Sequence, residues 1–579
     1  YVMAGELLWF GLELCFLMRW NGSCWVELGA GSASGDGIGG SQGLAQYPSL
    51  AIDPDGRPVV AWQGIADSSL EIYLRRWNDS AWREMGLNSA SAFSGISSTG
   101  EADHPSLAVG PDGRPVVAWE DTSSGNWEIY VKRWNGSAWV EMGAGSASGG
   151  GIRKKGRKSN RPSMAIGTDG TTIVAWQQDQ HTWERGIYVR RWNGTAWVEM
   201  GAGSASGAGI GSGPGEFKFP SLAIGPDGVP VIAWADHISG DIFVKYWNGS
   251  AWMEMGGSVS IMAANSYLPS LAIGPDKMPV VAWSEIITDT ARHAVYIKRW
   301  NGSAWTELGA GSASGDGISN NINDSVSPSL AIGSDGKPVI AWRELFYKNN
   351  VGMSVIYVRR WNGSLWEEVG AGSASGDGIS YSPEDIPAFT PSLVIGPGGR
   401  PVVAWGVPYS ILSNDEKIFV KRWDGSAWVE MDEGSATGRG ISDYPGRSMY
   451  PSLATGPDKL PVIAWVDYYW SGSDDIFVRR YPAACHALTL THTGQGGDPV
   501  AGPANSADCP NGHYNAGESI TLTASPAPGS IVSSWSGTNN NSSTAITNTI
   551  AMPDAKHTVV VSYREFHPTN WSYIPIAFK

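Results

Sequence analysis

The segment Pro105-Ser106-Leu107-Ala108-Val109-Gly110-Pro111-Asp112-Gly113-Arg114-Pro115-Val116-Val117-Ala118-Trp119, followed after a gap by Ile129–Met142, is one copy of a repeated unit. The chain contains eight such units, and their Ala-Trp tryptophans are Trp62, Trp119, Trp176, Trp234, Trp283, Trp342, Trp405 and Trp465. Successive copies lie 49 to 63 residues apart. A unit that recurs at a nearly constant spacing indicates a repeat architecture in which each copy packs against its neighbours.

Each unit has the pattern of four short β-strands. Residues 106–109 and 115–119 are apolar runs separated by Pro-Asp-Gly, whose residue types favour a tight turn. Residues 129–134 alternate between apolar and polar side chains, as a half-exposed strand does. The pair Asn135-Gly136 then predicts a β-hairpin into the strand at residues 138–142. Four antiparallel strands, repeated around a ring that hides their edges, describe the blades of a β-propeller.

The two ends of the repeat region predict how the ring closes. The last unit supplies three strands, at 451–455, 461–465 and 476–480, and then stops. Residues 24–28 supply a spare fourth strand near the start of the chain. We therefore expect an all-β protein with a propeller of about eight four-stranded blades. Because residues 1–20 also carry degenerate second and third strands, seven or nine blades, or a longer array, remain open.

Composition limits the kind of partner. The chain has 579 residues, 75 glycines, 30 tryptophans and a net charge of −15. This charge argues against a general nucleic-acid binder. A run of 18 apolar residues is absent from the sequence, so we predict no membrane span. The chain begins with Tyr in the middle of a repeat, and we expect a fragment or processed product with further sequence upstream.

Three regions are predicted: the propeller at 1–482, a small β-rich domain at 483–565 and a tail at 566–579. Cys485 and Cys509 lie in the second region, and a disulfide between them would fit an extracellular setting.

The repeat resembles bacterial secreted β-propellers built from units of the type Ser-Leu-Ala-x-x-Pro-Asp-Gly-x-Pro-x-Val-Ala-Trp. Residues 484–563, with Tyr514–Ala524, Trp535-Ser536-Gly537 and Met552-Pro553-Asp554, resemble the divergent internalin-B-type repeat of bacterial surface and secreted proteins. The final segment Trp571–Lys579 is similar to the tails of exported proteins of the Chloroflexi. These resemblances imply a secreted or surface-displayed protein.

An acidic residue follows most of the Ala-Trp pairs by one to three positions. If equivalent positions of the blades circle the central channel, these carboxylates form a ring that binds a cation such as Ca²⁺ or the hydroxyls of a sugar. The alternative is that each acid hydrogen-bonds within its own loop. The candidate residues are Glu120, Asp121, Asp179, Asp236, Glu285, Glu344 and Asp467.

Aromatic residues that are not repeated are the second set of candidates. Tyr468, Tyr469 and Trp470 form the densest cluster in the variable loops. The repeated tryptophans, by contrast, are expected to fill the space between blades. The sequence marks no catalytic pair of carboxylates and no spacing of metal ligands.

We expect an extracellular or cell-surface binding protein, used in adhesion, whose ligand is a polysaccharide or another surface protein. The variable loop face of the propeller is the predicted binding face. No cofactor is expected apart from the Ca²⁺ considered above. The alternatives are a glycoside-active, sialidase-like enzyme and a structural protein that assembles into surface filaments or layers.

Overall fold

The computed structural model describes residues 26–566 with gaps at 30–31, 33–36, 40–44, 67–68, 88, 91–94, 153–156, 181–183, 212–214, 261–265, 288–289, 321–322, 349–350, 381–387, 409–415, 432–434, 437–439, 443–446, 458, 469–473, 481–484, 505–511, 516–518 and 554–555. The chain divides into two compact units, and each is described by itself. The larger is Glu27–Tyr481, and the smaller contains Pro482–Lys579.

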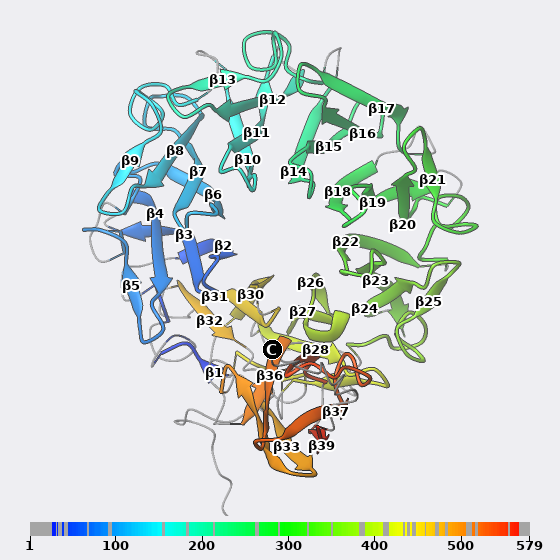
Figure 1. Ribbon diagram of the computed structural model, residues 1–579. Helices are drawn as coiled ribbons and strands as arrows, with labels where there is room; N and C mark the ends of the chain where they lie inside the picture. Colours follow the sequence, from blue (N-terminus) through cyan, green and yellow to red (C-terminus); the bar gives the residue numbers. More distant parts are fainter. Residues whose placement is uncertain are drawn as a thin grey trace, which may run out of the picture. The chain divides into compact units, whose positions relative to one another are not determined.

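The larger unit is a ring of eight four-stranded antiparallel sheets (Figure 1). Blade 1 is β2 (Ala45–Ile52), β3 (Pro58–Ala66), β4 (Ser69–Trp77) and β5 (Trp82–Glu84). Blade 2 is β6 (Ala102–Val109), β7 (Pro115–Asp121), β8 (Glu128–Trp134) and β9 (Trp139–Glu141). Blade 3 is β10 (Ser159–Ile166), β11 (Thr172–Asp179), β12 (Arg185–Trp192) and β13 (Trp197–Glu199). Blade 4 is β14 (Phe217–Ile224), β15 (Pro230–Asp236), β16 (Asp241–Trp247) and β17 (Trp252–Ser258).

The second half of the ring repeats this order. Blade 5 is β18 (Ser266–Ile273), β19 (Pro279–Ile287), β20 (Arg292–Trp300) and β21 (Trp305–Glu307). Blade 6 is β22 (Asp324–Ile332), β23 (Pro338–Lys348), β24 (Val351–Trp361) and β25 (Trp366–Glu368). Blade 7 is β26 (Phe389–Ile395), β27 (Pro401–Pro408), β28 (Glu416–Trp423) and β29 (Trp428–Glu430), with a short 3-10 turn at Pro397–Gly399. Blade 8 is β30 (Arg447–Thr455), β31 (Pro461–Tyr468), β32 (Asp474–Arg480) and β1 (Val26–Glu27).

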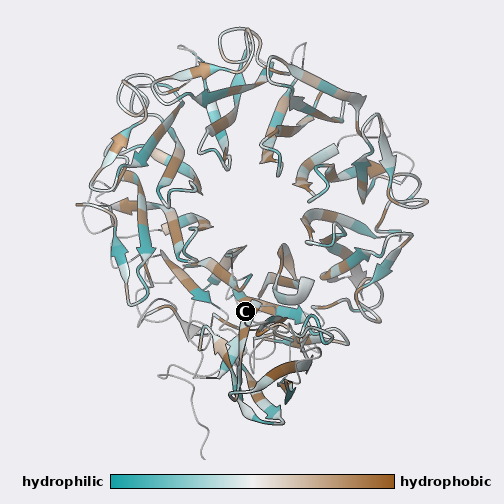
Figure 2. Ribbon diagram, in the orientation of Figure 1, coloured by the Kyte–Doolittle hydropathy of each residue, from teal (hydrophilic) through white to brown (hydrophobic). Residues whose placement is uncertain are grey.

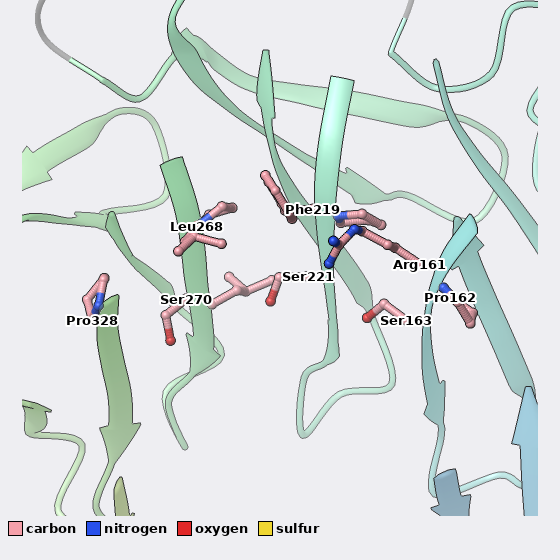
Figure 3. Close-up of a pocket in the computed structure, with 11 residues that line it drawn as sticks. Arg161, Pro162, Ser163, Phe219, Ser221, Leu268, Ser270 and Pro328 are labelled. Carbon is pink, nitrogen blue, oxygen red and sulfur yellow. The ribbon is translucent and has the colours of Figure 1, made fainter. Parts of the chain in front are cut away.

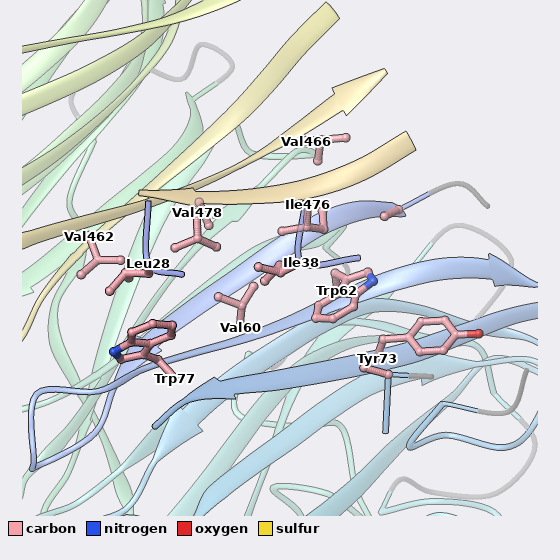
Figure 4. Packing of buried hydrophobic residues seen from close by; sticks show 13 residues of the cluster. Leu28, Ile38, Val60, Trp62, Tyr73, Trp77, Val462, Val466, Ile476 and Val478 are labelled. Carbon is pink, nitrogen blue, oxygen red and sulfur yellow. The ribbon is translucent and has the colours of Figure 1, made fainter. Parts of the chain in front are cut away.

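Blade 8 closes the ring, because its outer strand β1 comes from the start of the chain. Next to this strand, the backbone N–H of Ile38 donates to the carbonyl of Ile476 (2.7 Å), and that of Val478 donates to the carbonyl of Ser32 (2.8 Å). Leu28 and Ile38 pack with residues of blades 1 and 8 in one apolar cluster (Figure 4). The described residues thus confirm the prediction of eight blades closed by an N-terminal strand.

The repeated tryptophans fill the spaces between blades. The eight Ala-Trp indoles are all buried, and Figure 2 shows hydrophobic residues, in brown, on strands throughout the ring. Trp119 packs in one cluster with Val59 and Ile72 of the preceding blade. The same arrangement recurs around the ring, which confirms that these side chains serve packing between blades.

The Pro-Ser-Leu motif joins the innermost strands of successive blades. Ser106 Oγ accepts a hydrogen bond from the backbone N–H of Met164 in the next blade (3.2 Å). Ser163 Oγ accepts in the same way from Leu222 N (3.1 Å), and the equivalent bond is present at four other blade junctions. The repeated serine therefore links backbones that are about one repeat apart.

The Gly-Ala-Gly-Ser-Ala-Ser connection between units is a regular element rather than a variable loop. In blade 2, Glu141 accepts from the backbone N–H groups of Gly145 (3.0 Å) and Ala147 (2.9 Å). Ser146 Oγ donates to the carbonyl of Val131 on β8 (3.0 Å). The same serine contact is present in blades 3, 5, 6 and 7, so this connection is a structural part of the blade rather than a binding loop.

The smaller unit consists of two sheets. The first has the order β35 (His513–Asn515), β33 (Cys485–Thr493), β39 (His557–Glu565) and β37 (Ser530–Ser536). The second has the order β34 (Gly496–Gly502), β36 (Ser519–Pro526) and β38 (Thr547–Ala551). Its core contains Leu522, Trp535 and Val561. Cys509, like the side chain of Cys485, lies outside the described residues, so the predicted disulfide stays a prediction.

Candidate functional site

Most of the predicted acidic residues are buried inside their own blades. Glu285 and Glu344 lie two positions after a repeated tryptophan, and each accepts a hydrogen bond from that indole N–H (2.7 Å from Trp283 and 3.0 Å from Trp342). Both residues are almost fully buried. Since side chains alternate along a strand, the second residue after a buried tryptophan lies on the same face as the indole.

The predicted aspartates serve similar local roles. Asp121 accepts from the Trp119 indole (3.1 Å) and from the backbone N–H of Ser123 (3.0 Å). Asp236 accepts from the backbone N–H of Ile238 (3.0 Å) and therefore caps the turn that follows. Asp467, buried at the end of β31, accepts from the Ser448 hydroxyl (2.5 Å).

Asp179 is the one predicted acid that is not buried, since its side chain is about one-third exposed. Its Oδ1 pairs with Arg185 Nε on the neighbouring strand (3.0 Å). The six other acids are buried, so these predicted residues do not present an exposed ring of carboxylates to a ligand. Tyr469 and Trp470 lie outside the described residues, as does the side chain of Tyr468, and their predicted role stays a prediction.

Glu120 differs from the other acids because it reaches into the next blade. Its Oε1 accepts the backbone N–H of Arg161 on β10 (2.6 Å) and lies 3.8 Å from His104 Nδ1 on β6. Burial raises the pKa of Glu120 to about 7, although His104 and the Arg161 N–H oppose the shift. The pKa of His104 is also raised: burial lowers it, but a hydrogen bond to Asp103 and the nearby Glu120 outweigh that effect.

A second set of residues, not predicted from the sequence, lies on the innermost strands. Each blade has one residue directly before its Pro-Ser motif, at a point where the strand register shifts by a β-bulge. This residue differs from blade to blade. We call the set the pre-proline ring; its members are Tyr47, His104, Arg161, Phe219, Leu268, Ser327, Thr390 and Tyr450.

The backbone of the pre-proline ring is strained. Seven of its eight members have φ between 47° and 56°, a left-handed conformation that favours glycine. Bulky side chains such as those of Tyr47 and Phe219 are rare there, and a following proline disfavours helical backbone conformations further. If only the backbone mattered, glycine would be the least costly residue. Side chains are nevertheless present in every blade, which points to a role for the side chains themselves.

Several members of the ring contact one another across blade boundaries. Tyr47 stacks on His104, with ring centroids 4.2 Å apart. The ring centroids of Tyr47 and Tyr450, which belongs to blade 8, are 6.3 Å apart. Tyr47 and Tyr450 are 38% and 47% exposed. Blades 8, 1 and 2 thus present a continuous row of solvent-accessible aromatic rings.

The next blades form an open groove of about 440 Å³ (Figure 3). Arg161, Phe219 and Leu268 line it together with the Pro-Ser pairs of blades 3 to 5 and Pro328 of blade 6. The guanidinium carbon of Arg161 lies 5.0 Å from the centre of the Phe219 ring, in a cation–π contact. The groove therefore combines one cation with apolar and hydroxyl-bearing walls.

One signal in the sequence points to this ring. The position before Pro-Ser varies from blade to blade, as does the residue that precedes it, although the Pro-Ser pair that follows is constant. Variation in loops is the usual sign of a binding surface, whereas this position lies inside a strand.

Within the described residues, no helix is long and apolar enough to cross a membrane. In the same part of the chain, no group of three or more His, Cys, Asp or Glu side chains is arranged to hold a metal ion.

Comparison with known proteins identifies the smaller unit. Residues 490–566 match the family model of the divergent InlB B-repeat domain. This match confirms the resemblance inferred from the sequence of that region. No curated protein sequence matches the chain.

Solved structures resemble the ring at low identity. A polysaccharide lyase of family PL25, an ulvan lyase, is 11% identical, with a TM-score of 0.39 over 69% of this chain and 97% of that one. An α-L-arabinanase of Penicillium chrysogenum is 12% identical, with a TM-score of 0.31 over 56% and 92% of the two chains. A Dyadobacter fermentans protein of unknown function is 12% identical, with a TM-score of 0.34 over 57% and 95%. Because these TM-scores are low, the propeller architecture is assigned from the strand order and the ring closure described above.

Proposed function

We propose that the protein is an extracellular or cell-surface binding protein and that its ligand is a polysaccharide held on the pre-proline ring. The observation that carries this proposal is the row of exposed side chains kept in left-handed bulges on the innermost strands. This site replaces the loop-face acids as the main candidate, because six of the seven acids are buried and hydrogen-bonded.

The chemistry of the row favours a sugar ligand. Aromatic rings such as those of Tyr47 and Tyr450 offer flat apolar faces with a polar edge, and the C–H face of a pyranose stacks on such a surface. The rings belong to neighbouring blades, so successive sugar residues of one polymer would contact successive blades. Several weak contacts of this kind give avidity without a deep pocket.

The smaller unit supports the location. Divergent InlB B-repeat domains are typical of bacterial surface and secreted proteins, and residues 490–566 match that family. A chain that joins such a domain to a propeller with an exposed aromatic row suits adhesion to an extracellular polymer.

Binding is favoured over glycoside hydrolysis by the burial of the carboxylates. A hydrolase of the common type needs two carboxyl groups that flank the substrate, about 5 to 10 Å apart. Glu120, Glu285 and Glu344 are each at most 3% exposed and accept hydrogen bonds from their own fold. A panel of glycosides incubated with the protein tests the alternative, since release of sugar by the wild type would support an enzyme.

A glycan array tests the proposal directly. The wild type is compared with the double variant Tyr47→Ala/Tyr450→Ala, which removes the two exposed rings. The control is Leu365→Ala, which removes an exposed apolar side chain (53%) from a hairpin turn. We expect the wild type and the control to bind the same glycans and the double variant to lose them. Absence of wild-type binding, or equal binding by the double variant, would contradict the proposal.

A further inference from the structure

Arg161 is unusual among the arginines of the ring. The guanidinium groups that end the third strand of several blades pair with the aspartate of the Pro-Asp-Gly turn; examples are Arg133 with Asp112 and Arg360 with Asp335. Arg161 instead lies on an innermost strand, and its side chain forms no ion pair with a described carboxylate. It is exposed to solvent, so its charge is available to a ligand.

The Arg161 guanidinium is held beside an aromatic ring, with its central carbon over Phe219 at 5.0 Å from the ring centre. The contact with the ring is made by the cation as a whole, and a guanidinium carries five N–H donors. Those N–H groups match the two oxygens of a carboxylate or sulfate. The Arg161 guanidinium forms no hydrogen bond or ion pair with the described residues, so its N–H groups are left for an anion.

The walls of the groove suit a sugar next to that anion. Leu268 (44% exposed) and the prolines offer apolar surface to a pyranose C–H face. Ser163 Oγ already accepts from Leu222 N, so its O–H remains able to donate to a sugar oxygen. The groove thus joins an anion contact, an apolar wall and a hydroxyl donor.

We infer that this groove binds an acidic polysaccharide, with a sugar carboxylate or sulfate held by Arg161. The inference rests on the proposed function and specifies its ligand class. Arg161 is the one arginine or lysine in the pre-proline ring, and His104, one blade away, already faces Asp103 and Glu120. The net charge of −15 disfavours unspecific attraction of polyanions. We therefore expect one specific anion contact rather than general binding of anionic polymers.

Titration calorimetry with three kinds of probe tests the inference. Oligogalacturonate carries carboxylates, its carboxyl-reduced form has the same backbone without charge, and a sulfated galactan carries sulfate esters. The variants are Arg161→Gln and, as a control that also removes one positive charge, Arg114→Gln. Arg114 lies in a Pro-Asp-Gly turn, outside the groove, and is half exposed.

We expect the wild type and Arg114→Gln to bind one of the charged probes at least tenfold more tightly than the neutral probe, with an affinity that falls as salt rises. The charged probe that binds identifies the anion as carboxylate or sulfate. Arg161→Gln is expected to lose that preference and its salt dependence while keeping weak binding to the neutral probe.

Equal binding of charged and neutral probes by the wild type, or an unchanged preference in Arg161→Gln, would overturn the inference. Failure of both charged probes to bind would overturn it as well. The proposed function stands in each of these cases if neutral glycans still bind through Tyr47 and Tyr450 on the array. It falls separately if no glycan binds at all.

Discussion

Replacing Glu120 by glutamine is expected to stabilise the protein at pH 8 and to change its stability little at pH 4.5. Glu120 is 3% exposed, and burial raises its pKa from 4.5 to about 7. The native state therefore holds this proton more tightly than the unfolded chain. By linkage, the free energy of unfolding falls as the pH rises from about 4.5 to about 7.

The magnitude follows from that pKa. The difference between 4.5 and about 7, at about 1.4 kcal/mol per pKa unit, corresponds to about 3 kcal/mol lost above pH 7. A glutamine carries no charge and keeps the carbonyl oxygen that accepts Arg161 N. Blade 3 already contains this arrangement, because Gln177 Oε1 accepts Phe219 N at the equivalent position (3.2 Å).

Urea unfolding followed by tryptophan fluorescence at pH 4.5 and pH 8 measures the effect. The substitution Glu120→Gln should raise the free energy of unfolding, relative to the wild type, by up to about 3 kcal/mol more at pH 8 than at pH 4.5. The reciprocal variant Gln177→Glu places a carboxyl group in the matching buried position and should lose stability at pH 8. An effect of Glu120→Gln that is the same at both pH values would refute the reasoning, because no buried charge would then be involved.

Three further predictions concern the packing of the ring. In urea unfolding, Trp283→Phe should lower the free energy of unfolding by about 1.5 to 3 kcal/mol more than Trp405→Phe does. The reason is that the Trp283 indole donates to the buried Glu285, whereas the Trp405 indole has no partner among the described residues. Equal losses in the two variants would argue against the Trp283–Glu285 hydrogen bond. Leu28→Ala should lower the free energy of unfolding by about 2 to 5 kcal/mol, visible as a lower Tm, because Leu28 packs in the apolar cluster where the ring closes. An unchanged Tm would mean that ring closure does not depend on Leu28. Ser163→Ala should lower the free energy of unfolding by about 1 kcal/mol, since the backbone N–H of Leu222 in the next blade loses its acceptor. An unchanged free energy of unfolding would show that water replaces the hydroxyl.

Much of the fold was predictable because its signals are local. The turn at Pro111-Asp112-Gly113 and the hairpin at Asn135-Gly136 are set by the backbone preferences of neighbouring residues. A spacing of about 57 residues then gives four strands per unit. The same local logic places Glu285 on the buried face of its strand, two residues after Trp283, and could have shown that this acid is buried beside the indole.

The pre-proline ring was not predictable by those rules. A residue before proline is expected to be extended, yet Tyr47 and His104 are left-handed. The bulge that requires this conformation lies on the innermost strand, where neighbouring blades are joined by the hydroxyls of the Pro-Ser motif. The left-handed conformation is therefore caused by the packing of the blades into a ring rather than by the type of residue at this position.

The sequence by itself determined the repeat, the four strands of each blade and the separate C-terminal domain, because each depends on residues close together in the chain. It offered residues 24–28 as the strand that closes the ring but left the number of blades open, because that strand pairs with β32 at the far end of the repeat region. Only the tertiary structure decided which variable side chains gather into a surface. Tyr450 and Tyr47 are brought into contact by closure of the ring, and Arg161 meets Phe219 across a blade boundary. The physical reason is that these contacts join residues one repeat or more apart, and their geometry exists only when the blades have packed into a circle.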